Sequence, residues 1–280
     1  MLPLLIIKPP NNIIIMKKLI LFAAVILFGN NAIAQRKTYL LFEFMKVAPQ
    51  QESAYLETES FWEKIHDQRV KSGAILGWQL WRLQPGGVNQ DYQYVTVQVF
   101  DDPIKMFQDG PGESYLTIAK RAFPTMSDAD LLLKRTESLK TRDLADTFYL
   151  EQIDQTKGQF ELSLGAVMGV NFMKVKPNDY AKYENGESKI FKPEWQNRVD
   201  GGRTGSWSLL KVITPQGNAL NSGISHVSLD KFKDFNQLYG SPNNYNTIRS
   251  EADQKAWQEA LTIREINSCT AVLIKKVKGL

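Results

Sequence analysis

The tetrapeptide Phe44-Met45-Lys46-Val47 recurs as Phe172-Met173-Lys174-Val175, and this repeat decides the fold. Further matches follow in the same order, with one extra residue in the second copy. They pair Pro49 with Pro177, Tyr55 with Tyr183, Glu59 with Glu187, Ser60 with Ser188, Arg69 with Arg198, Gly73 with Gly202 and Trp78 with Trp207. The repeat is far longer than the units of solenoid proteins, so the colinear series indicates a domain duplication.

Both copies predict the same order of secondary-structure elements. The first copy predicts strands over 38–47, 77–83, 92–100 and 146–153, a helix over 52–72, and a helical region over 113–140 that Pro124 interrupts. The second copy predicts strands over 166–175, 206–213, 223–230 and 268–277, and helices over 179–199, 231–239 and 249–261. The order β-α-β-β-α-β is the ferredoxin-like arrangement. The sequence therefore predicts an α+β protein with two ferredoxin-like units in tandem, over 35–157 and 158–280.

Two ferredoxin-like sheets can pack through the faces that their helices leave uncovered. This layout resembles the dimeric α/β-barrel superfamily. The duplication would supply both units in one chain, so a single chain would be a pseudo-dimer and would not need a second copy. The opening of each copy, with FMKV-x-P, Tyr, Glu-Ser, Arg-Val and Gly before Trp, also resembles an uncharacterised group of exported bacterial tandem proteins. The superfamily includes monooxygenases, chlorite- and haem-handling proteins, isomerases and ligand-binding proteins, and it has no shared catalytic signature. The resemblance therefore implies a fold and no catalytic residue.

The N-terminus has the pattern of an export signal. A basic pair, Lys17-Lys18, precedes an apolar run of ten residues over 19–28 and the small-residue site Ala32-Ile33-Ala34. The run is too short to cross a membrane, which takes roughly 20 residues. We therefore expect residues 1–34 to be a signal peptide with an upstream extension, with a membrane anchor as the alternative. The mature protein is then soluble, periplasmic or extracellular, and has no stable membrane span.

The positive charge of the chain comes mostly from this N-terminal segment. The full chain has a net charge of +4, and its hydrophobic content of 43% is that of a globular protein. Three of the 34 basic residues and none of the 30 acidic ones lie in 1–34, which leaves 31 basic and 30 acidic residues. Nucleic acid is therefore not an expected partner. The single cysteine, Cys269, excludes an internal disulfide, and we interpret it as a core residue rather than a reactive thiol.

Ionisable residues share the apolar face of the predicted helix 52–72. At 100° per residue, Glu59, His66 and Arg69 fall on the same face as Tyr55 and Trp62. One interpretation is a polar pocket in which Glu59 or His66 acts as general base and Arg69 holds an anion. The alternative is a structural network in which a Glu–Arg pair ties the helix to the sheet.

Candidate ligand-binding residues lie in both copies. They are Trp78, Tyr94, Glu187, Glu194, Arg198, Trp207 and His226. Glu194 stands in the place of His66, although Pro193 should kink the second helix. Tyr94 and His226 lie on the strand faces opposite the valines, which we assign to a polar, aromatic interior between the sheets. Sheet-to-sheet packing, with both tryptophans in the core, is the alternative for this set.

Motifs for metals and cofactors are absent. The chain has two histidines, no HExxH and no CxxC, so we predict no metal site and no cofactor. A haem ligated by His66 or His226 is the alternative. The sequence favours a protein that binds a small molecule in a polar and aromatic cavity. A cofactor-poor monooxygenase- or isomerase-like enzyme that uses Glu59, His66 and Arg69, and a structural or interaction protein of the cell envelope, are the alternatives.

Overall fold

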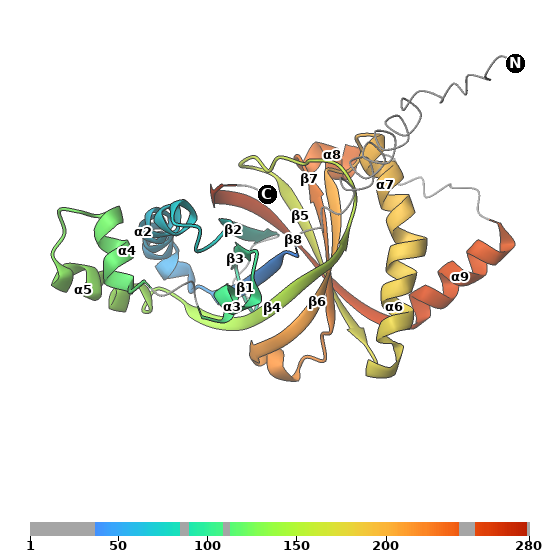
Figure 1. Cartoon of the computed structure of the whole chain (residues 1–280), viewed down its shortest axis with the longest axis horizontal. Helices are drawn as coiled ribbons and strands as arrows, with labels where there is room; N and C mark the ends of the chain where they lie inside the picture. Colours follow the sequence, from blue (N-terminus) through green and yellow to red (C-terminus); the bar gives the residue numbers. More distant parts are fainter. Residues whose placement is uncertain (1–36, 85–89, 109–112, 241–249, 279–280) are drawn as a thin grey trace, which may run out of the picture. The chain divides into compact units, whose positions relative to one another are not determined.

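The described part of the chain is built around a closed barrel of eight strands (Figure 1). The computed structural model describes residues 37–84, 90–108, 113–240 and 250–278, so the predicted export signal lies outside the described residues. The strands are β1 (Tyr39–Lys46), β2 (Gly77–Gln84), β3 (Tyr94–Phe100), β4 (Asp143–Gln155), β5 (Val167–Val175), β6 (Ser206–Gly217), β7 (His226–Phe232) and β8 (Arg264–Val277). The predicted α+β class is confirmed.

Each half of the chain supplies one continuous run of four strands. The first half forms the run β4-β1-β3-β2, and the second half forms β8-β5-β7-β6. The runs join edge to edge, because β2 pairs with β8 and β4 pairs with β6, both antiparallel. The halves are thus hydrogen-bonded as well as packed face to face, and closure removes the exposed edges that open sheets present.

The barrel interior is apolar. Successive side chains of a strand point to opposite faces, and Val95, Val97 and Val99 of β3 point into an interior shared with Phe42 and Phe44. The opposite face of β3 therefore points outward, toward the helices. The predicted polar interior is wrong for this reason: Tyr94 packs with Tyr55 of the helix outside, and His226 of β7 packs with Tyr183.

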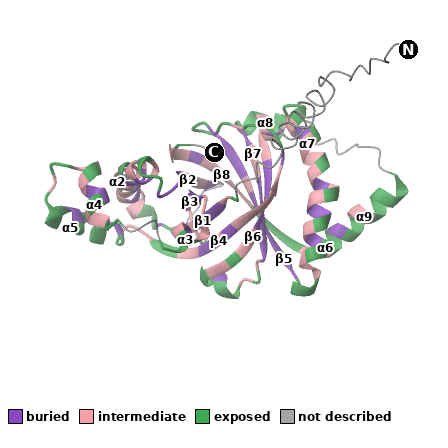
Figure 2. Cartoon of the chain, viewed as in Figure 1, coloured by how far each residue is buried: buried purple, intermediate pink, exposed green. Residues whose placement is uncertain are grey.

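The helices lie outside the barrel. They are α2 (Glu52–Lys71), α3 (Pro103–Phe107), α4 (Tyr115–Ala122), α5 (Asp128–Ser138), α6 (Tyr180–Gly186), α7 (Lys192–Asp200), α8 (Phe235–Gly240) and α9 (Glu251–Thr262). Short turns η1 (Pro49–Gln51), η2 (Pro177–Asp179), η3 (Glu187–Phe191) and η4 (Asn218–Asn221) complete the set. Helix α2 packs on β2 and β8, and α7 packs on β6. Exposed residues dominate α5 and α9 (Figure 2).

The helical region predicted over 113–140 consists of α4 and α5, and the interruption predicted at Pro124 is confirmed. Ser114 caps α4, where its side chain accepts a hydrogen bond from the backbone N–H of Thr117, and Ser127 caps α5 in the same way. None of the helices that the structure describes is long and apolar enough to span a bilayer.

The second copy of the long helix contains a π-helical turn. α6 ends at Gly186, η3 is a π-helix, and α7 begins at Lys192 with Pro193 in its first turn. A π-turn holds one more residue than the α-helical turn that it replaces. The extra residue that the repeat shows after Ser188 is therefore absorbed here.

Candidate functional site

The candidate site is a cavity of about 310 Å³ between α2 and the outward face of the first-half sheet. The predicted residues Glu59, His66, Arg69 and Trp78 all line it. Side chains from the strands and from the residue before β4 complete its polar lining, namely Glu43, Thr96, Gln98 and Arg142. The structure thus brings together the residues that the helical face predicted, together with Trp78 of β2.

Glu59 is a buried carboxyl group with an open hydrogen-bonding position. The residue is 2% exposed, and its Oε1 accepts no hydrogen bond from the residues that the structure describes. The Arg142 Nε lies 3.9 Å from this oxygen. Burial raises the pKa of Glu59 to about 7, against the opposing effects of Arg142 and Tyr55. The group can therefore exchange a proton near neutral pH.

His66 lies between two indoles. Its ring stacks on Trp78 at 5.1 Å between centroids and 15° between planes, and the Trp62 ring lies 6.1 Å away with 33° between the planes. The Arg69 Nη1 is 3.2 Å from His66 Nδ1. A guanidinium only donates, so Nδ1 is the acceptor and the proton of the neutral ring is on Nε2. Burial, and then the charge of Arg69, hold the pKa of His66 well below its ordinary value.

Arg69 is fixed by a chain of hydrogen bonds to the sheet. Its Nη1 donates to Gln98 Oε1 at 2.7 Å, and Gln98 Nε2 donates to Glu43 Oε2 at 3.2 Å. Thr96 Oγ1 donates to the same Glu43 oxygen at 3.1 Å. The structural network and the polar pocket are therefore both present, and the network holds Arg69 and His66 in the cavity wall.

Sequence reasoning missed Glu43, Gln98 and Arg142. Arg142 carried a usable signal, because it stands just before the last strand of the first copy, where Arg264 stands in the second. The polar face of β3, which carries Gln98, is predicted to point into the barrel, and no sequence pattern marks Glu43 of β1 as a site residue. Tyr94 is not part of the cavity lining, and its hydroxyl donates to Glu52 at 2.5 Å.

The second half has a larger cavity, of about 490 Å³, at the equivalent place. Of the predicted residues, Glu187, Glu194 and Trp207 line it, together with Arg264, whose guanidinium is hydrogen-bonded to Glu187. Arg198 is buried, its guanidinium lies over the Trp195 ring, and it is outside this lining.

The predicted correspondence of His66 with Glu194 is wrong. Since η3 absorbs the extra residue before α7 begins, Trp195 occupies the place of His66. The contacts agree: Arg198 packs on Trp195, three residues earlier, as Arg69 packs on His66.

His226 is not available to a ligand. It is fully buried, its Nδ1 is 3.0 Å from the Ser225 hydroxyl, and its Nε2 is 3.1 Å from Glu184. Burial lowers the pKa of its ring, against the effect of Glu184. His226 thus holds α6 to β7.

Neither histidine is placed to bind haem iron. Both nitrogens of His226 are hydrogen-bonded, and the proton on His66 Nε2 occupies the lone pair that an iron would need. Within the described ranges, no cluster of three His, Cys, Asp or Glu side chains could hold a metal ion.

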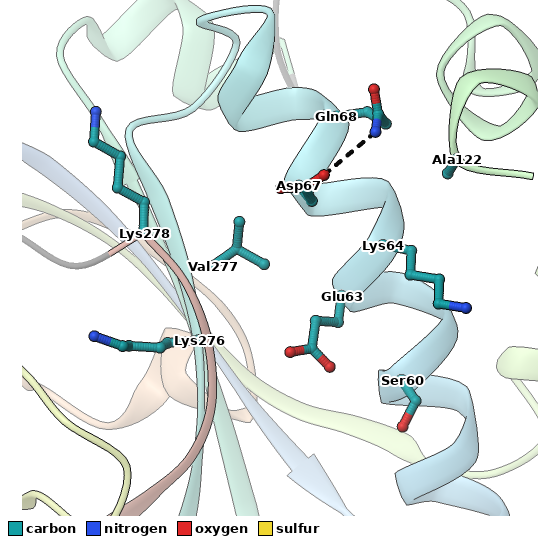
Figure 3. A pocket seen from close by; sticks show the side chains of 9 residues that line it. All are labelled: Ser60, Glu63, Lys64, Asp67, Gln68, Ala122, Lys276, Val277 and Lys278. Atoms are coloured by element: carbon teal, nitrogen blue, oxygen red, sulfur yellow. Dashed lines mark hydrogen bonds between the residues drawn. The ribbon is translucent and has the colours of Figure 1, made fainter.

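Two other cavities offer fewer buried polar groups to a ligand than the cavity beside α2 does. One, of about 560 Å³, opens at an end of the barrel and includes Lys231 and Lys276 among apolar interior residues. The other, of about 580 Å³, is a surface groove between α2 and the end of β8 (Figure 3). Its charged side chains reach solvent, and Gln68 hydrogen-bonds Asp67 at 3.3 Å beside it.

Comparison with known proteins identifies the fold. No protein-family model and no curated protein matches this sequence. A candidate monooxygenase from Lactobacillus acidophilus is similar in structure, with a TM-score of 0.52 and 11% identity over 87% of this chain and 97% of that one. An anthrone oxidase-like protein has a TM-score of 0.52 and 12% identity, over 87% and 94%. A candidate monooxygenase from Fusobacterium nucleatum has a TM-score of 0.51 and 10% identity, over 89% and 98%. These neighbours show that the chain has a dimeric α/β-barrel fold.

Proposed function

We propose that the α2 cavity binds a small organic molecule with an acidic hydroxyl group, such as a phenol or an enol, and that Glu59 accepts its proton. One observation carries this proposal: a buried carboxyl with an open Oε1 and a pKa of about 7 faces a cavity. General bases work best when their pKa lies near the working pH. A carboxylate that only tied α2 to the sheet would not need an open oxygen.

The other lining groups suit the product of such a transfer. The hydroxyl O–H bond breaks, its proton goes to Glu59, and the electron pair stays on the ligand oxygen. The Nε2–H of His66 can donate to that oxyanion, and the guanidinium of Arg69 offsets its charge. Since Gln98 and His66 already fix Arg69, little reordering accompanies the reaction.

The neighbours fit this class of ligand. Two are described as candidate monooxygenases, and one as anthrone oxidase-like. An anthrone is a ketone whose enol tautomer is a phenol, and loss of a proton from either form gives an aryloxide, so a substrate of that class would use a base such as Glu59. Proton removal is also the first step expected of an isomerase, so Glu59 serves both enzyme alternatives.

We also propose that the halves 35–157 and 158–280 are tandem ferredoxin-like units derived from one ancestor, and that the chain is a monomer. The matching strand runs and the colinear sequence repeat support this. Export through a signal peptide over 1–34 is likewise a proposal, supported by the basic pair, the apolar run and the Ala-x-Ala site. Fractionation of cells and the N-terminal sequence of the mature protein test it.

The binding proposal is tested with p-nitrophenol, whose anion absorbs visible light. We expect the wild type to bind it and to raise the anion fraction relative to buffer. The matched ligand 4-nitroanisole, which has no proton to give, should bind at least about tenfold more weakly. Glu59→Gln should lose the anion signal, whereas Glu57→Gln, an exposed carboxylate on the same helix, should keep it.

Three results would overturn the proposal. Equal affinity for p-nitrophenol and 4-nitroanisole would show that the hydroxyl is not recognised. An unchanged anion signal in Glu59→Gln would show that Glu59 is not the proton acceptor. Absence of binding by any phenol would favour the interaction-protein alternative.

A further inference from the structure

The second cavity has aromatic walls where the first has acid–base groups. Trp195, Trp207 and Trp257 line it with Phe191, and the Trp257 and Phe191 rings lie 4.3 Å apart between centroids. These side chains come from α7, β6, α9 and η3. Aromatic walls of this kind bury a planar ligand with little loss of side-chain freedom.

The π-turn creates this difference between the halves. After the extra residue, Phe191 takes the place of Trp62 and Trp195 takes the place of His66. Without the extra residue Glu194 would stand at that place, so the π-turn puts an indole there instead of a carboxylate. π-turns of this type are frequent at functional sites.

Three carboxylates line this cavity, Glu187, Glu194 and Asp230, and Asp230 has an oxygen without a hydrogen-bond partner among the described residues. Asp230 of β7 pairs in register with Trp207, as Gln98 of β3 pairs with Trp78. Asn171 Nδ2 donates to Asp230 Oδ2 at 2.8 Å, whereas the shielded Oδ1 accepts no hydrogen bond from the described residues. Burial raises the pKa of Asp230 to about 6, against the effects of Asn171 and Arg198.

The basic group of the cavity is already engaged. The Arg264 guanidinium is hydrogen-bonded to Glu187 and lies 4.6 Å from the centre of the Phe191 ring. Its charge is matched by a carboxylate on one side and by an aromatic face on the other. Asp230 is thus a polar group with an open position, and that position takes a hydrogen-bond donor.

We infer that the cavity formed by η3, α7, α9 and the outward face of β5–β7 is a second ligand site, which binds a planar aromatic ring that carries an aminoalkyl side chain. The ring packs between Trp195 and Trp257 over Trp207, and the amine donates to Asp230 Oδ1. This site is independent of the proposed function of the α2 cavity, because the two cavities share no lining residue.

The test is calorimetric binding of two probes that differ in charge. Both probes have an indole ring with a short side chain of similar length. The side chain of tryptamine ends in an ammonium group, and that of indole-3-propionate ends in a carboxylate. We expect tryptamine to bind the wild type at least tenfold more tightly than indole-3-propionate. Asp230→Asn should weaken tryptamine binding at least tenfold, and Glu137→Gln, an exposed position on α5, should not change it.

Trp257→Ala provides a second variant on a different element, in case Asp230→Asn does not fold. Trp257 is only half-buried, and we expect its removal to weaken tryptamine binding several-fold while circular dichroism shows a folded protein. Equal affinity for the two probes would overturn the inference. So would wild-type tryptamine affinity in a folded Asp230→Asn or Trp257→Ala protein, or no tryptamine binding to the wild type.

Discussion

Replacing Glu59 by glutamine should stabilise the protein in alkaline solution, and the structure sets the size of the effect. Burial raises the pKa of this carboxyl from the ordinary 4.5 to about 7. Between these values the folded chain holds a proton that the unfolded chain has lost, so the free energy of unfolding falls as pH rises. At about 1.4 kcal/mol for each pH unit, the full loss above pH 7 is roughly 3 kcal/mol.

Glutamine has nearly the same shape and cannot ionise, so the variant does not suffer this loss. Near pH 4.5 the neutral carboxyl and the amide should be nearly equal in stability. Near pH 8 the Glu59→Gln protein should be more stable than the wild type by up to about 3 kcal/mol. Arg142 keeps a partner in the variant, because its Nη1 donates to the Ser138 carbonyl at 2.7 Å.

Denaturant unfolding of both proteins at several pH values measures this difference. Glu57→Gln is the matched control, since Glu57 is an exposed carboxylate on the same helix. A Glu59→Gln protein that is less stable than the wild type by the same amount at every pH would refute the reasoning. That result would mean that Glu59 is an ionised structural partner of Arg142, with no raised pKa.

Three further predictions concern single residues. His66→Ala should weaken p-nitrophenol binding about tenfold, as loss of a hydrogen bond to a charged oxygen implies; unchanged affinity with a lower melting temperature would make His66 purely structural. Phe44→Ala should lower the free energy of unfolding by about 3–5 kcal/mol, because Phe44 is fully buried against Phe148 and Phe172, and denaturant unfolding checks it. The thiol of Cys269, whose pKa burial raises to about 12, should react with a disulfide reagent roughly tenfold or more slowly in the folded than in the unfolded protein; equal rates would contradict its burial.

Much of the fold could be predicted from the sequence, because the positions that match between the two copies mark where each copy and its elements begin. The matched positions in the two copies gave the order of elements, and the valines of 95–99 gave the alternation of β3. The sequence could not show which face of β3 points into the barrel, because side chains alternate every two residues whichever face is inside. The prediction that Tyr94 and His226 lie inside the barrel is therefore wrong, because both face the helices.

Only part of the candidate site could be predicted, because only part of it depends on local sequence spacing. A helical face is fixed by spacing alone, so Glu59, His66 and Arg69 could be grouped before any tertiary structure was known. Arg142 reaches Glu59 from the residue before β4, and Gln98 of β3 reaches Arg69 of α2. Contacts of that kind depend on packing, and no local pattern encodes them. The π-turn shifted the second helix by one residue, which is why Glu194 was matched with His66 in place of Trp195.

The protonation of Glu59 is the most direct measure of whether the α2 cavity is a proton-accepting site. Carbon-13 NMR of the labelled glutamate carboxyls, with Glu59→Gln for assignment, gives its titration curve in free and p-nitrophenol-bound protein. We predict a midpoint near pH 7 in the free protein and protonation of Glu59 when the ligand binds near pH 8. A midpoint near the ordinary 4.5, or a carboxyl that p-nitrophenol leaves unchanged, would contradict the proposed function.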